Sequence, residues 1–307
     1  MKIPEFKIRT DLALEEREGL KEAAEEVSGV SFKKWEGKRS AAQITEVKVL
    51  NEHGAKALGK PMGSYLTLEA DKLLMPDEDF HSEVSDELAL LLKGLLKQKT
   101  GKNILVAGLG NQSVTPDSLG PRTVSNLCVS AEGLKAIAPG VMAQTGMETA
   151  RILLGIIKEV QPDLVIAIDA LAARSIRRLG TTIQLTDTGI HPGSGVGNHR
   201  RGMTRENLGV PVIAIGVPTV VGAAAIVHGT VNALVRILTA SKEGSRYGEY
   251  IRELDSDSQY ELIRELLEPE FGAMFVTPQD MDERICKLSA AIAEGIRRAV
   301  ERLEEER

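Results

Sequence analysis

Two aspartates stand at positions where a folded chain could use them for chemistry. Asp117 comes a few residues after the apolar run Asn103 to Gly108, and Asp169 comes directly after the apolar run Asp163 to Ile168. Both runs are typical of buried parallel strands, whose carboxyl ends meet at one edge of a sheet. We therefore expect the two carboxylates to face one cleft, where they could exchange protons with a substrate or bind a metal ion.

Each aspartate also has a purely structural explanation. The pair at 115–116 fits a helix cap followed by proline, which would leave Asp117 to complement the helix dipole. Asp169 would cap a helix beginning at Ala170, with Arg174 one turn further along to keep the carboxylate ionised. The local sequence leaves both explanations open.

A third polar loop, from Thr186 to Arg200, follows the strand-like run TTIQLT. It is rich in glycine, and the close approach of glycine backbone lets amide groups bind a ligand or stabilise an oxyanion. His191 in this loop is a possible third group of the site, as a metal ligand or proton carrier. The predicted oxyanion or substrate loop consists of Gly193, Ser194, Gly195, Gly197 and Asn198.

Apolar runs of strand length alternate with helical segments from residue 103 onward, as in α/β folds. The runs are nearly continuous, so we expect a mostly parallel sheet with helices on both faces. Residues 6–100 predict an N-terminal α+β extension, with a helix in 11–27 and strands in 42–50 and 64–69.

A single α/β domain is expected over residues 1–307. Residues 101–240 would supply the core sheet and the catalytic loops. Residues 241–258 are polar and predict a surface excursion, and residues 259–307 predict C-terminal helices with one buried apolar stripe.

The composition limits the partners of the chain. A net charge of −6 and a pI near 5.6 argue against nucleic-acid binding, which needs a basic face. Only Cys128 and Cys286 are present, so neither a disulfide framework nor a zinc knuckle is indicated. No run of uncharged residues is long enough for a membrane helix, and the charged N-terminus lacks a signal segment. We expect a cytoplasmic protein that contacts no membrane.

Several longer strings occur in a fixed order: RTDLA, GLGN with TPDSLGP, APGVMAQTG, PDLVIAIDALAARS, DTGIHPGSGVGN and GVPVIAIGVPTVV. Together they resemble the spore germination protease family of endospore-forming bacteria. The resemblance covers nearly the whole chain and is strongest between residues 103 and 221.

The resemblance implies an endopeptidase that degrades small acid-soluble spore proteins during germination, in the forespore and spore core. It also implies a zymogen, usually a homotetramer, that removes its own N-terminal segment. The implied catalytic residues are Asp117 and Asp169. The implied fold is similar to that of hydrogenase maturation proteases, whose nickel ligands draw attention to His191.

An autoprocessing site is expected at Glu5 and Phe6, because substrates of the family are cut after an acidic and before an apolar residue. Residues 1–5 would then be the prosegment. Lys7 departs from the small apolar residue usual in that context, and Gly222 stands where the family typically carries an acidic residue.

Three hypotheses follow for the activity. In the first, Asp117 and Asp169 work without a cofactor, because nearby carboxylates do not ionise together, so one accepts a proton while the other donates. In the second, a divalent metal ion is bound by Asp117, Asp169 and His191. In the third, the chain is a non-catalytic module that binds a peptide or nucleotide at its glycine-rich loop and strand edge, with the two aspartates as helix caps.

Overall fold

One mixed sheet forms the centre of the molecule. The computed structural model describes residues 10–19, 27–70, 78–97, 103–127, 129, 133–193, 201–240, 260, 263–265 and 274–305. Within these ranges nine strands pair in the order β1-β2-β3-β7-β8-β6-β4-β5, and β9 pairs with β8. Their bounds are β1 Val30–Glu36, β2 Gln43–Val49, β3 Gly63–Glu69, β4 Ile104–Gly108, β5 Leu134–Ile137, β6 Leu164–Ala173, β7 Thr182–Thr186, β8 Val212–Gly222 and β9 Phe275–Val276.

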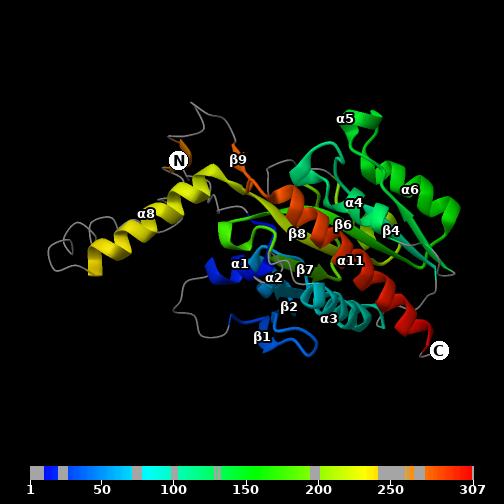
Figure 1. The fold of residues 1–307 in the computed structure, drawn as a ribbon, viewed down its shortest axis with the longest axis horizontal. Helices are drawn as coiled ribbons and strands as arrows, with labels where there is room; N and C mark the ends of the chain where they lie inside the picture. The colour runs from blue at the N-terminus through cyan, green and yellow to red at the C-terminus, as the bar shows by residue number, and fades with distance from the viewer. Residues whose placement is uncertain are drawn as a thin grey trace.

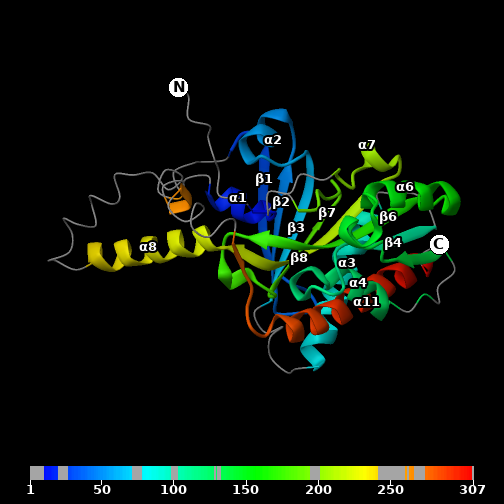
Figure 2. The same cartoon turned by 90° about the horizontal axis from the view of Figure 1, so that it is seen from above.

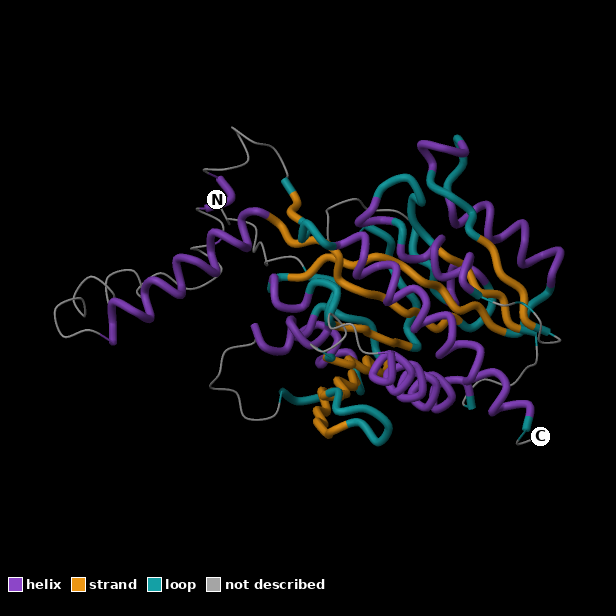
Figure 3. Tube along the Cα trace, in the orientation of Figure 1, coloured by secondary structure: helices purple, strands orange, loops and turns teal. Residues whose placement is uncertain are grey.

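Helices lie on both sides of this sheet, which confirms the predicted α/β class (Figures 1 and 3). The bounds of the described helices are α1 Ala13–Gly19, α2 Glu52–Leu58, α3 Glu78–Leu96, α4 Leu119–Asn126, α5 Met142–Thr145, α6 Thr149–Val160, α7 Arg205–Leu208, α8 Ala223–Ala240 and α11 Met281–Glu304, with short 3-10 turns η2 Thr115–Asp117 and η3 Ile176–Arg178. In the described part of the chain, no helix has the length and apolar character needed to cross a bilayer.

The parallel and antiparallel parts of the sheet come from different parts of the chain. β5, β4, β6 and β8 run parallel, as the apolar runs predict. The extension predicted for residues 6–100 supplies β1, β2 and β3, which pair antiparallel and join the same sheet through β7. The extension is therefore part of the central sheet rather than a separate layer.

Alternating side chains of the parallel strands enter two different cores. Ile166 and Ile213 pack into the core beneath α3, α4 and α11, whereas Val165 packs beneath α6 and α7. Side chains of successive strand residues point to opposite faces, so one strand fills both cores. Figure 2 shows α6 and α7 on one side of the strands and α3, α4 and α11 on the other. In both cartoon views α8 extends away from the rest of the described structure.

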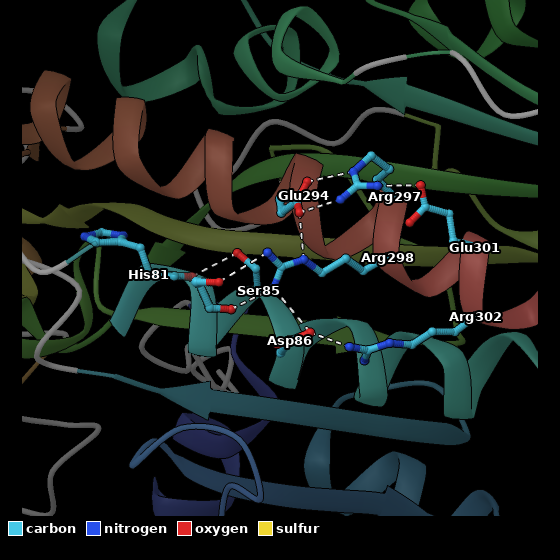
Figure 4. Close-up of polar contacts among 9 residues, drawn as sticks. His81, Ser85, Asp86, Glu294, Arg297, Arg298, Glu301 and Arg302 are labelled. Carbon is cyan, nitrogen blue, oxygen red and sulfur yellow. Dashed lines mark hydrogen bonds and ion pairs between the residues drawn. The ribbon is translucent and has the colours of Figure 1, made fainter. Parts of the chain in front are cut away.

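A network of ion pairs joins α3 to α11 (Figure 4). Arg298 of α11 lies 2.7 Å from Glu294 on its own helix and 3.2 Å from Asp86 on α3. Arg302 contacts the same Asp86. Arg297 adds a second partner for Glu294 at 2.7 Å. The network fixes how the C-terminal helix lies along the helix of the N-terminal extension.

The N-terminal segment is held against the far end of β6. Glu15 is buried, and its carboxylate accepts hydrogen bonds from the backbone N–H groups of Arg174 at 2.6 Å and Ser175 at 3.0 Å. Arg178 lies 3.2 Å from the same carboxylate. Of the helix predicted for 11–27, the described part is α1, because residues 20–26 lie outside the described ranges.

β6 is longer than the sequence predicts. It continues through Asp169 to Ala173, so a helix beginning at Ala170 is wrong, and Arg174 does not lie one turn along such a helix. The strand continues because β8 pairs with it up to the Ala173–Val221 pair. Long-range pairing has thus overridden the local helix signal of the alanine-rich sequence.

Candidate functional site

A cavity of about 700 Å³ lies at the carboxyl ends of β4 and β6. Asp117 and Asp169 both line it, so the structure brings the two predicted catalytic aspartates to one cavity. The N-terminal end of α6 contributes Thr149 and Ala150 to its wall. Backbone dipoles at the start of a helix favour negative charge, which suits a cavity lined by carboxylates.

Asp117 is positioned by the tight connection between β4 and α4. One oxygen of its carboxylate, Oδ2, accepts a hydrogen bond of 2.7 Å from the Asn111 backbone N–H. Gly110 has a φ of +109°, and a Cβ there would lie 2.1 Å from the Asp117 carbonyl oxygen. A Cβ at Gly120 would lie 2.3 Å from the Leu109 carbonyl oxygen. Glycine is therefore required where the two ends of this connection pack together.

The helix cap predicted at Thr115 is wrong. Thr115 is the first residue of η2, the residue before it is Val114, and no side chain caps the turn. Asp117 lies in this 3-10 turn, and α4 begins two residues later at Leu119. A role for Asp117 in complementing the helix dipole remains compatible with this position.

Asp169 lies within a strand rather than at its end. Its register partner in β8 is Gly216, and the residue is only 5% exposed. The carboxylate oxygen Oδ1 accepts a hydrogen bond of 3.0 Å from the N–H of Ala170. Burial of a carboxylate is costly without compensation. Its place on the cavity wall is therefore a reason to expect function.

Several residues that line the cavity were not predicted from the sequence. Asp11 reaches the cavity from the N-terminal segment, Glu148 from the start of α6, and Arg201 from the segment before α7. Glu148 accepts a hydrogen bond of 3.2 Å from the Arg201 backbone N–H. Asp11 belongs to the RTDLA string, which was the one sequence signal that could have pointed to this residue. The string does not predict that Asp11 lies at the cavity.

Thr219 is a further cavity residue that no local pattern reveals. It is the extra residue of a β-bulge in β8, because Leu171 pairs with Pro218 and Ala172 pairs with Val220. Bulges re-aim side chains and are common near active sites. Thr219 is 1% exposed, and its hydroxyl has no hydrogen-bond partner among the described residues.

His191 lies apart from the two aspartates. It lines a neighbouring cavity of about 70 Å³ together with Asp11, Lys60 and Tyr65. Burial raises the pKa of Tyr65 to about 12. Across the described ranges, no three His, Cys, Asp or Glu side chains are grouped closely enough to hold a metal ion. The ligand set of Asp117, Asp169 and His191 is therefore not assembled there.

Part of the predicted site lies outside the described residues. Gly193 is described and lines the large cavity. The remaining members of the predicted oxyanion loop, Ser194, Gly195, Gly197 and Asn198, are not in the described ranges, and neither is the autoprocessing site at Glu5 and Phe6.

Comparison with known proteins gives the context of this cavity. The model of the germination protease family matches residues 8–247. The chain belongs to the germination protease family. It is 47% identical to the germination protease of Caldanaerobacter subterraneus subsp. tengcongensis, over 96% of this chain and 94% of that protein. It is 39% identical to the germination protease of Clostridium perfringens, over 96% of both chains.

A solved structure of another protein was also matched. It is the NiFe hydrogenase maturation protease HycI from Thermococcus kodakarensis, at 16% identity and a TM-score of 0.37, over 67% of this chain and 99% of that one. Membership of the germination protease family, shown by the sequence matches, makes the chain an endopeptidase that acts in spore germination.

Proposed function

We propose that this endopeptidase cleaves small acid-soluble spore proteins with Asp117 and Asp169 as its acid and base. The proposal is supported by one observation above all: in a chain of the germination protease family, these two aspartates line the same cavity. The cavity lies beyond the carboxyl end of β4 and beside the C-terminal half of β6, at the edge of the sheet where α/β proteins usually bind their ligands.

The chemistry needs two carboxyl groups in different protonation states. Ionisation of one carboxyl disfavours ionisation of a second in the same cavity, so the pair retains one proton over a range of pH. The ionised group takes a proton from the attacking water, and the protonated group donates to the leaving amine. Gly193 lies on the cavity wall, where loop amides would stabilise the tetrahedral oxyanion.

We further propose that the chain is made as a homotetrameric zymogen in the forespore. It would remove its first residues by cutting between Glu5 and Phe6. Asp11, which lines the cavity, is only five residues beyond that bond, and this short separation favours self-cleavage.

Substitution of each aspartate tests the mechanism. We expect Asp117→Asn and Asp169→Asn each to lower cleavage of an acid-soluble spore protein by at least about 10³-fold, because each removes an essential proton carrier. Intact-mass spectrometry over time would follow both the substrate and the loss of N-terminal residues. Near-normal cleavage by either variant would contradict the acid–base pair.

Asp163→Asn provides the matched control. Asp163 precedes β6 at the opposite end of the strand, and its carboxylate accepts a hydrogen bond of 2.9 Å from the Asn103 N–H. We expect this variant to cleave normally. A parallel assay after exhaustive chelation tests the metal hypothesis, since retained activity in metal-free protein would exclude it. An active wild type would also exclude the non-catalytic peptide-binding module.

A further inference from the structure

In the part of the chain that the structure describes, one edge of β6 has no neighbouring strand inside the cavity. On its β4 side, the ladder ends at the pair of Gly108 with Ile168. Leu109 then donates its N–H to the Ile168 carbonyl over 2.8 Å. The N–H and carbonyl groups of alternate residues in a strand point to the same side. Ala170 and Ala172 therefore continue the edge that β4 leaves.

Ala172 shows that this edge binds another segment of the chain. The Asp11 N–H donates to the Ala172 carbonyl over 3.0 Å, and the Ala172 N–H donates to Oδ2 of Asp11 over 2.9 Å. Asp11 thus lies beside β6, held by one main-chain and one side-chain hydrogen bond. Leu109 and Asp11 occupy the two positions that flank Ala170 on this edge.

Ala170 is the open position between them. Among the described residues, none donates to its carbonyl oxygen across this edge, and its N–H contacts the carboxylate of the preceding Asp169. The edge is exposed to the cavity, because Ala170 and its neighbours Asp169, Leu171 and Ala172 all line it. An open edge of a strand is a template for another peptide.

We propose that the substrate binds in extended form along this edge, as a strand added between Leu109 and Asp11 and paired with the backbone of Ala170. The substrate class is thus an extended peptide segment. This inference rests on the proposed function and specifies how its substrate is held. The paired substrate residue lies beside Asp169, because Asp169 directly precedes Ala170.

Binding by strand addition can be distinguished from binding through side-chain contacts alone. Main-chain hydrogen bonds hold the peptide, and only every second substrate residue directs its N–H toward β6. Because Leu109 and Asp11 already occupy the flanking positions, one substrate N–H pairs with Ala170. Blocking that amide should therefore weaken substrate binding, whereas blocking the amides on either side of it should not.

An amide scan of the substrate tests this pairing. The probe is a ten-residue peptide copied from around the bond that mass spectrometry shows to be cut in the spore-protein assay, with one backbone amide N-methylated at a time. We expect kcat/KM to fall about tenfold or more at one position near the cut bond, and to change less than about twofold at the two neighbouring positions. Equal losses at neighbouring positions, or no loss at any position, would overturn the proposal.

The same peptides separate this inference from the proposed mechanism. Fluorescence anisotropy with labelled peptides measures binding to Asp117→Asn, which we expect to bind without cutting and to show the same single sensitive amide in Kd. If the wild type cuts nothing, the proposed function fails and this inference falls with it. If the wild type cuts but neither scan has a single sensitive amide, the binding mode alone is wrong.

Ala170→Pro is the corresponding change on the protein. Proline removes the N–H that the added strand would use, and in the free protein this N–H contacts Asp169. Binding of the uncut peptide is therefore measured beside kcat/KM, and we expect Kd to rise and kcat/KM to fall about tenfold or more. A folded Ala170→Pro protein with normal kinetics would contradict the proposal, and if this variant does not fold, the amide scan decides.

Discussion

Asp117 reaches the cavity because of its neighbours in the connection from β4 to α4. The Asn111 N–H binds its carboxylate at 2.7 Å, and the Asn111 side chain in turn accepts a hydrogen bond of 2.7 Å from Gln144. The connection turns back tightly at Gly110, where the backbone has a positive φ. A carboxylate held by backbone contacts has little freedom to move, which suits a group that must meet a substrate at a fixed place.

Gly110→Ala should therefore lower activity by displacing Asp117. The added Cβ would lie 2.1 Å from the Asp117 carbonyl oxygen, so the turn that carries the carboxylate must shift. A displacement of about 1 Å costs roughly 10²-fold in rate, and we expect a loss of that size in kcat.

Gly146→Ala is the control for backbone strain alone. Gly146 has a φ of +68°, but a Cβ there would meet no atom within 4 Å. Gly146→Ala should lose about 1 kcal/mol of unfolding free energy from the strained φ, as measured by urea unfolding. Gly110→Ala should lose more, because its Cβ also meets backbone. Equal activity in the two variants would contradict the role given to Gly110.

At the scale of elements, the two longest described helices hold opposite ends of the chain together. α3 belongs to the N-terminal extension and α11 is C-terminal, and Leu88 of α3 packs in the same core as Ile292 of α11. Glu294 lies at the centre of the ion-pair network above this core (Figure 4). Hydrogen bonds from Arg297, and next from Arg298, lower the pKa of Glu294 to about 2, although burial opposes the shift.

This lowered pKa predicts how the stability of the helix pair depends on pH. A carboxyl whose pKa is lower in the folded state stabilises the protein above its unfolded pKa, and the stabilisation is lost as the pH falls. Glu294→Gln should lower the free energy of unfolding by about 1 kcal/mol at neutral pH, a value discounted for solvent screening. The difference from wild type should shrink between pH 4.5 and about 2, the unshifted and folded pKa values.

Urea unfolding of both proteins across this pH range is the measurement. Glu283→Gln is the control, because Glu283 pairs with Lys287 but its side chain is 69% exposed, and such pairs contribute little. A difference between wild type and Glu294→Gln that stays constant down to pH 2 would show that the ion-pair network is not responsible.

At the scale of the whole molecule, one sheet and one large core join the extension to the catalytic half. The core that contains Leu68 of β3 also contains Ile213 of β8 and Ile285 of α11. A boundary between two independent domains would need an interface with few crossing contacts. The sheet continues across residue 100, where the predicted extension ends, so the described structure has no such domain boundary there.

We therefore expect the extension and the catalytic half to unfold together. Trp35, the single tryptophan, lies in the edge strand β1 and packs against the main core, so its fluorescence reports on the extension. Far-UV circular dichroism reports on the whole chain. The two urea transitions should coincide, as in a two-state unit. An earlier midpoint by fluorescence would show that β1 to β3 unfold separately.

Much of this arrangement follows from local sequence. Continuous apolar runs predicted β4 and β6, because burial on two faces leaves a direct pattern in the sequence. The placement of Asp117 and Asp169 at one cavity followed from the same patterns, since parallel strands bring their carboxyl ends together.

The tertiary structure alone decided what joins these aspartates in the cavity. Asp11 binds Ala172 across 161 positions of sequence, and no local pattern records such a contact. The same holds for Thr219, whose place depends on a bulge, and for His191, which the fold directs to the neighbouring cavity. Local sequence determines which segments become buried strands and helices, because that depends on residue type and spacing. Which edges and loops then meet depends on packing between distant segments.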